Sequence, residues 1–296
     1  MRFGINFVNG GGLAHPDAAV ELATIADQLG FSTLWSADHI VIPVGFASRY
    51  PAAPTGEAPF HDDFPFNEVL VHLAFLASVT HRIRLATGVM IIAQRNAVEV
   101  AKGVATLDHL SRGRAVLGLG TGWLREEFDA LGATFDDRVA RTEEAVEVLR
   151  RLWGGPGAEF HGRHFDFGPA TCSPRPCDPK GVPIVIGGYA MATARRAARI
   201  GDGHYPGPAS LADIERYRAE ICRVARDRGR DPAEIETIVA APYDRPLDAD
   251  LARRYAEAGA AEIIIDLAVT AGDAGGSVRR TLETFRADVM DRLDDR

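Results

Sequence analysis

The sequence predicts an α/β fold, a (β/α)8 TIM barrel with insertions on its rim. Eight short strand patterns alternate with amphipathic helical patterns, which is typical of βα units around a parallel sheet. A chain of 296 residues is suited to a barrel that forms one domain. We therefore expect a single domain over residues 1–296, with insertions at about 40–67 and 154–182. An open doubly wound sheet would also alternate, so the count of eight strands decides for the barrel.

The predicted strands are short apolar runs, and the third and fifth are almost continuously hydrophobic, as expected of strands buried on both faces. They begin near Phe3–Val8, Thr33–Ser36, Ile83–Ile92, Ala115–Leu119, Ile184–Ile186, Gly203–Tyr205, Glu236–Ala240 and Glu262–Leu267. The segments between them repeat apolar residues every three to four positions, which predicts helices.

Composition excludes several classes of protein. The formal net charge of -8 argues against a nucleic-acid binder, which needs a concentrated basic face. No apolar stretch is long enough to span a bilayer, so no membrane is expected as a partner. The three cysteines have no metal-ligand spacing, and an odd number fits a reducing, cytoplasmic environment. No pattern of histidines and carboxylates predicts a metal site.

The two insertions have different characters. The first, at about 40–67, contains five prolines and several aromatic residues and follows the second strand. Because the carboxyl ends of barrel strands form the catalytic face, it is predicted to be a substrate lid for an organic molecule with apolar surface. The second predicts a small hairpin followed by an extended arm, with His161 and His164 as surface or lid residues.

Asp38 and His39 follow the second strand, where both side chains can project into the mouth of a barrel. A neighbouring carboxylate can orient an imidazole, which gives a tunable proton donor. The alternative is that Asp38 caps a turn and His39 is solvated.

A glycine at position 88 interrupts the third strand. Such a glycine indicates either a bulge with close backbone approach to a ligand or a corner that closes the barrel. Further along, Gly118, Gly120 and Gly122 end a strand and open a helix, with Thr121 among them. Amide groups at such a turn can bind an anion, although the match to the dinucleotide fingerprint is loose.

A second glycine pair, Gly187–Gly188, also lies between a strand and a helix. Each glycine-rich helix start is a weak signal by itself. Together, two such starts on one rim favour an extended anionic cofactor held at two places.

These segments together resemble the luciferase-like flavin and deazaflavin oxidoreductases, and most closely the branch that uses coenzyme F420. The resemblance covers roughly residues 1–205, with a weaker match through the last two strands. It depends on the sequences DQLGFSTLWSADHIVIP, ATLDHLSRGR, GLGTGWLREEF and PIVIGG.

The resemblance implies roles for particular residues. His39 is the expected proton relay, with Asp38 beside the deazaflavin ring. The third strand is expected to bulge at Gly88–Val89, often with a cis peptide bond, against that ring. The residues expected to hold the phosphate and side-chain portion are Gly120, Thr121, Gly122, Gly187, Gly188 and Tyr189.

The resemblance also implies an activity, the transfer of a hydride between reduced F420 and a small organic substrate, in a homodimer. The alternative is an FMNH2-dependent monooxygenase with FMN as cofactor, and a third possibility is a barrel that binds a flavin-like ligand without turnover. The chain departs from the family's sugar-phosphate and alcohol dehydrogenases at two positions. Where those enzymes have a glutamate, this chain has Trp123, and where they have a tryptophan, it has Pro43. Both argue against alcohol oxidation, whereas reduction of an activated double bond needs less acid–base machinery.

Overall fold

The computed structural model describes residues 1–51, 53, 55–267 and 277–294, and in them it has the predicted (β/α)8 barrel. All barrel strands pair in parallel, and β3 pairs with β2 on one side and β5 on the other, which closes the sheet. The strands are β1 (Arg2–Ile5), β2 (Thr33–Ser36), β3 (Arg84–Thr87), β4 (Met90–Ile91), β5 (Ala115–Gly120), β8 (Ile184–Gly187), β9 (Gly203–Tyr205), β10 (Glu236–Ala240) and β11 (Glu262–Ile265).

The third barrel strand is divided in two. Its halves, β3 and β4, are separated by Gly88 and Val89, so the barrel has eight strand positions within the described residues. The predicted run at 83–92 is therefore one barrel strand with a bulge in it.

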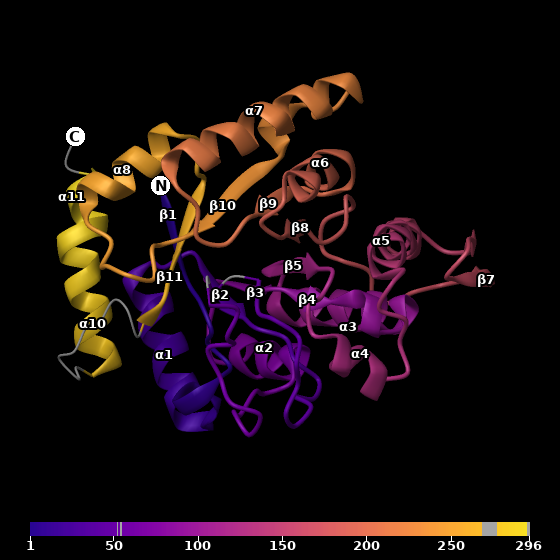
Figure 1. Ribbon diagram of the computed structural model, residues 1–296, viewed down its shortest axis with the longest axis horizontal. Helices are drawn as coiled ribbons and strands as arrows, with labels where there is room; N and C mark the ends of the chain where they lie inside the picture. Colours follow the sequence, from indigo (N-terminus) through magenta and orange to yellow (C-terminus); the bar gives the residue numbers. More distant parts are fainter. Residues whose placement is uncertain (52, 54, 268–276, 295–296) are drawn as a thin grey trace.

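Helices surround the strands (Figure 1). They are α1 (Pro16–Leu29), α2 (Val69–Ala77), α3 (Ala97–Ser111), α4 (Arg125–Ala130), α5 (Arg138–Gly154), α6 (Met191–Ile200), α7 (Leu211–Asp227), α8 (Ala249–Glu257), α10 (Val278–Phe285) and α11 (Asp291–Asp294). Short 3-10 turns lie at Gly11–Ala14, Ile92–Gln94 and Pro232–Glu234, and a π-helical turn at Arg286–Met290 joins α10 to α11. Apolar faces of the helices pack on the outside of the barrel and form the largest core cluster.

A second, smaller core fills the inside of the barrel around Trp35, which is fully buried. The Trp35 ring stacks on Tyr205 with 5.7 Å between ring centroids, and its Nε1 donates to Glu262 at 3.3 Å. The buried Glu262 carboxylate is also paired with Arg84 at 2.8 Å, as a buried charge requires. The inside of the barrel is thus packed around Trp35.

The described residues of the first insertion (40–51, 53 and 55–67) form an irregular segment, called the lid below, whose end is attached to the loop after β1. The main chain of Gly11 donates to Pro65 at 3.0 Å, and that of Asn67 donates to Asn9 at 3.0 Å. Asn9 is fully buried, and its amide also bonds the main chain of Ala37 and Asn67.

The second insertion contains the predicted hairpin, with β6 (Ala158–His161) antiparallel to β7 (Asp166–Ala170), followed by an extended arm. His161 is exposed beside Asp166, as predicted. The prediction of a surface position for His164 is wrong: its side chain is only 6% exposed, with Nδ1 3.5 Å from Asp137. The tight turn at 162–165 folds His164 inward, where Glu144 accepts its main-chain N–H at 2.7 Å.

Candidate functional site

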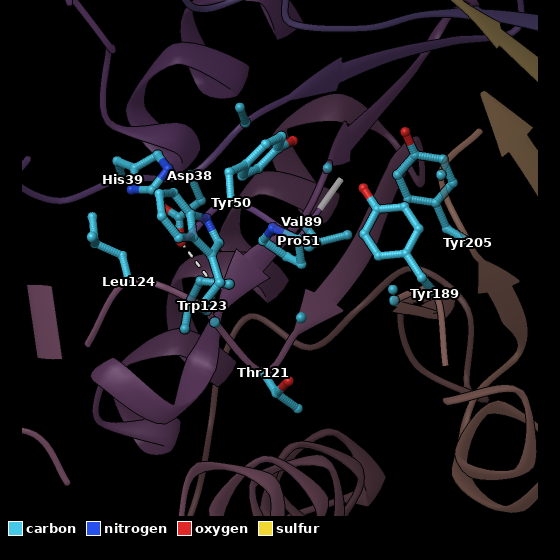
Figure 2. Close-up of a pocket in the computed structure, with 18 of the residues that line it drawn as sticks. Asp38, His39, Tyr50, Pro51, Val89, Thr121, Trp123, Leu124, Tyr189 and Tyr205 are labelled. Carbon is cyan, nitrogen blue, oxygen red and sulfur yellow. Dashed lines mark hydrogen bonds between the residues drawn. The ribbon is translucent and has the colours of Figure 1, made fainter. Parts of the chain in front are cut away.

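The predicted site residues all line one cavity of about 550 Å³ at the carboxyl ends of the barrel strands. Asp38 and His39 follow β2, Gly88 and Val89 lie in the divided third strand, and the remaining residues lie at the ends of β5 and β8 or just after them. Figure 2 shows His39 and Trp123 at one end of the cavity, Tyr189 and Tyr205 at the other, and Val89 between them. The lid contributes Tyr50, Pro51 and Phe60.

The imidazole of His39 is bound to Glu127 of α4. The distance from His39 Nδ1 to Glu127 Oε2 is 3.0 Å, and the two side chains are 10% and 1% exposed. The other oxygen of Glu127 accepts the main-chain N–H groups of Ile40 at 2.7 Å and Val41 at 3.3 Å. One carboxylate therefore holds both the histidine and the start of the lid.

Burial acts to raise the pKa of Glu127, but hydrogen bonds from His39 and Ile40 and the proximity of the imidazole outweigh it, so that the pKa lies below its usual value. Glu127 is consequently an ionised carboxylate at neutral pH. An ionised carboxylate accepts hydrogen bonds and cannot donate them. Nδ1 of His39 is then the donor, and Nε2 is the ring nitrogen left for a bound molecule.

Asp38 does not orient His39, contrary to the prediction from their adjacency. Its two oxygens bind Arg95 at 2.7 and 2.8 Å, and one also accepts the main-chain N–H of Ile91 at 2.9 Å. Successive side chains at the end of a strand point in opposite directions, which explains why the neighbours have different partners. Asp38 lines the cavity as a charge neutralised by Arg95.

Val89 forms the projecting part of the bulge, after the cis peptide bond that the resemblance implies at Gly88–Val89. A Cβ on Gly120 would lie 2.6 Å from Cγ2 of Val89, and one on Gly187 would lie 2.8 Å from Cγ1. Both distances are too short for a side chain. The two glycines are thus required where the backbone must admit the Val89 methyl groups.

The two glycine-rich helix starts differ in charge, and the first is less suited to an anion than the second. After β5, helix α4 has six residues, and the carboxylates of Glu126 and Glu127 already occupy its first turn. These negative charges disfavour an anion there. Helix α6 has ten residues and no acidic residue in its first turn, and Gly188, Ala190 and Thr193 at its start line the cavity.

Arg138, at the start of α5, lines the same cavity and was not predicted. Its guanidinium lies 3.7 Å from the Phe135 ring centre, and it donates to the main-chain oxygens of Gly122 at 3.2 Å and Phe135 at 3.0 Å. Burial and the nearby Arg125 lower its pKa, but an arginine remains charged. Arg138 thus brings to the cavity a positive charge that the start of α4 does not provide.

An aromatic wall closes the His39 end of the cavity. Trp123 meets His39, Phe46 and Tyr50 with centroid separations of 6.1, 5.7 and 5.2 Å, each edge to face. Phe60 and Phe66 approach the imidazole at 5.1 and 5.4 Å. Lid and barrel together surround the histidine with apolar rings.

Four phenols also line the cavity: Tyr189 and Tyr205 at the end opposite His39, Tyr50 beside Trp123, and Tyr243; among them only Tyr189 was predicted as a site residue. Burial raises the pKa of Tyr50, Tyr189, Tyr205 and Tyr243, and their mutual proximity raises those of Tyr189, Tyr205 and Tyr243 further. All four hydroxyl groups are therefore neutral hydrogen-bond donors at physiological pH.

His204, on β9, supports the glycine turn at the start of α6. It is fully buried, and its Nε2 lies 3.2 Å from the carbonyl oxygen of Gly188. Burial lowers the pKa of His204 to about 4, so its ring is neutral. Its position inside a three-residue strand gave no sequence signal of this contact.

Among the described residues, no group of three or more His, Cys, Asp or Glu side chains is arranged to hold a metal ion. In the same part of the chain, none of the helices has the length and apolar character needed to cross a membrane.

The chain belongs to the luciferase-like monooxygenase family, whose model matches residues 1–290. An uncharacterised protein of Mycobacterium tuberculosis is 33% identical over 84% of this chain and 85% of its own length. An F420-dependent glucose-6-phosphate dehydrogenase of Kineococcus radiotolerans is 32% identical over 64% of this chain and 52% of its own. The solved structure of the monooxygenase RslO1 from Streptomyces bottropensis has a TM-score of 0.74 at 22% identity and 99% coverage of both chains, a likeness in fold.

Proposed function

We propose that the protein is an F420-dependent oxidoreductase that transfers a hydride between the deazaflavin and a small organic substrate. The observation that carries this proposal is the buried His39–Glu127 pair at one end of a cavity whose wall is the Val89 bulge. Such a pair can move a proton at the place where a hydride is exchanged. A relative named as an F420-dependent dehydrogenase supports this choice of cofactor.

The residues present fit an elongated cofactor with an aromatic ring and a phosphate. Gly120 and Gly187 admit Val89 into the cavity, and an added Cβ on either would collide with it. At the α6 end, the open helix start and Arg138 offer a positive potential to a phosphate. We assign the flat wall at Val89 to the ring and the α6 end to the phosphate, with Thr121, Gly122, Gly188 and Tyr189 along the tail.

Bound F420 supplies or accepts a hydride, and the chain supplies the rest. His39 exchanges a proton at Nε2, because Nδ1 is held by Glu127. Trp123 and Phe60 exclude water from the imidazole. The phenols of Tyr50 and Tyr243 donate hydrogen bonds to an oxygen atom of the substrate.

These surroundings favour an uncharged substrate with apolar surface and a carbonyl-conjugated double bond. Aromatic rings from the lid and Trp123 line the His39 end. Pro43 and Trp123 replace residues of alcohol-oxidising relatives, which supports reduction of an activated double bond over alcohol oxidation.

The test is a side-by-side fluorescence titration of the purified protein with F420 and FMN. We expect tight binding of F420 and weak binding of FMN, followed by oxidation of reduced F420 in the presence of conjugated enones. Tight binding of FMN alone, with oxygen uptake in the presence of FMNH2, would instead make the protein a monooxygenase. His39→Gln should keep F420 affinity and lose turnover.

We also propose that the protein is a homodimer that pairs through α2 and α3. Val71 is 70% exposed, Phe75 42% and Leu110 63%, and the two helices pack side by side. An exposed apolar patch of this kind favours an interface. Light scattering after size exclusion should give twice the chain mass for the wild type and the single mass for Val71→Asp. Val44→Asp, at an 87% exposed valine of the lid, is the control that should remain dimeric.

A further inference from the structure

We propose that Glu127 is a positioning residue, which fixes the tautomer of His39 so that Nδ1 carries the hydrogen and Nε2 serves the substrate. This inference rests on the proposed proton-transfer role of His39. It adds a residue that the sequence and the resemblance did not single out.

The geometry assigns a separate task to each oxygen of Glu127. Oε2 lies 3.0 Å from Nδ1 of His39, while Oε1 accepts the main-chain N–H of Ile40 at 2.7 Å. The main-chain N–H can only donate, which fixes Oε1 as an acceptor. With the side chain 1% exposed, water has little access to change this arrangement.

The ionisation of Glu127 determines which atom carries the hydrogen in its bond to His39. Because its hydrogen bonds lower its pKa despite burial, both oxygens are acceptors, and Nδ1 must donate. Asp38 cannot do the same, since Arg95 and the main chain of Ile91 occupy its oxygens.

The pair then provides a balanced proton step. In reduction, a hydride adds to one carbon of the substrate's double bond, and the π electrons move toward the conjugated oxygen. The proton on Nε2 of the imidazolium is transferred to the resulting anion. The ring becomes a neutral imidazole that keeps its Nδ1 hydrogen on Glu127. The negative charge of Glu127 stabilises the imidazolium before the step, and the reverse reaction returns the proton to Nε2.

Glu127→Gln tests this directly. The amide oxygen of the glutamine must stay on Ile40 N–H, so its NH2 group faces Nδ1 and forces Nδ1 to accept. The neutral tautomer of His39 should therefore reverse. The measurement is the 15N chemical shifts of the two ring nitrogens, recorded on the protein without cofactor at a pH where the ring is neutral. The signals of His39 are assigned by their loss in His39→Gln.

The matched control is Glu126→Gln. Glu126 is on the same helical turn and also accepts lid N–H groups, from Ala47 at 2.8 Å and Ser48 at 3.1 Å, but it does not bind His39. We expect His39 in the Glu126→Gln variant to have the same tautomer as in the wild type. With F420 and substrate present, Glu127→Gln should lower kcat by about 10²- to 10⁴-fold, the usual contribution of a positioned proton donor, with little change in the KM for substrate.

The outcomes separate this inference from the proposed function. An unchanged tautomer in Glu127→Gln overturns the positioning role even if the enzyme reduces enones. A reversed tautomer supports it even if reduced F420 is never oxidised, in which case the proposed function fails alone. If the variant does not fold, the wild-type spectrum decides: a hydrogen on Nε2 of the neutral ring, rather than on Nδ1, overturns the proposal.

Discussion

Arg95 binds both carboxylate oxygens of Asp38, at 2.7 and 2.8 Å, in a pair whose side chains are 13% and 2% exposed. Asp38 also accepts the N–H of Ile91, at the end of β4. The pair therefore ties the segment after β2 to the segment that follows the bulge, at the wall of the cavity that Asp38 lines.

Removing one partner should leave a buried, unpaired charge. Asp38→Ala is expected to lower the free energy of unfolding by about 3–5 kcal/mol, because the Arg95 guanidinium loses its counter-charge. Urea denaturation monitored by tryptophan fluorescence measures this. Asp136→Ala, which removes the exposed partner of Arg125, is the control and should change stability by about 0–1 kcal/mol. Equal effects in the two variants would contradict our account of the Asp38 site.

A side chain at Gly120 should displace the bulge. Gly120→Ala would place its Cβ 2.6 Å from Val89, so Val89 or the strand must move. We expect a loss of about 1–3 kcal/mol in stability from overpacking and at least a tenfold loss of F420 affinity. Gly154→Ala, at the end of α5, where the added Cβ meets nothing within 4 Å apart from its own helix backbone and chain neighbours, should keep wild-type affinity and lose no stability. Cofactor affinity at the wild-type level in Gly120→Ala would argue against Val89 as the ring wall.

Arg138 should contribute to cofactor affinity through the phosphate. Arg138→Gln is expected to weaken F420 binding about 10- to 100-fold, the range for a charge-assisted hydrogen bond. It should leave binding of the deazaflavin chromophore without its phosphate tail unchanged. Arg151→Gln, at an exposed position on the same helix, is the control. If both ligands lost affinity equally, Arg138 would be supporting the ring and not the phosphate.

Buried histidines predict a particular loss of stability in acid. The pKa values of His72 and His204 are lowered from 6.5 to about 4 by burial. Between those values the unfolded chain binds protons that the folded chain does not, so stability decreases as the pH falls from about 6.5 to 4. Each histidine contributes up to about 1.4 kcal/mol per pH unit.

Urea unfolding at several pH values from 7 to 5 measures this slope, and the wild type should lose stability faster than His204→Gln. His61→Gln, at an exposed lid position, should keep the wild-type slope. Parallel curves for the wild type and His204→Gln would mean that His204 accepts a proton in the folded protein.

The strand pattern predicted the barrel, because alternation of buried strands and amphipathic helices is a local property of the sequence. The same pattern located the ends of β2, β5 and β8, and hence Asp38, His39 and the glycines of the cavity. The partners of these residues could not be read in this way. Glu127 lies 88 positions from His39, and its contact depends on how the short helix α4 packs under the lid.

The sequence did contain one indication that Glu127 has a role other than flanking a phosphate site. Two adjacent glutamates at the start of a helix already satisfy its positive end, which is an argument against a phosphate at the same place. For Arg138 no comparable local signal exists, since its role follows from the cavity that it happens to face.

The attachment of the lid has an evolutionary consequence. Glu126 and Glu127 hold the lid by the main-chain N–H groups of Ile40, Val41, Ala47 and Ser48, a set of contacts available to any residue type except proline. The side chains of these four residues can therefore diverge without loosening the loop from the barrel. A scaffold of this kind lets mutation change the side chains that surround the cavity while His39 keeps its place.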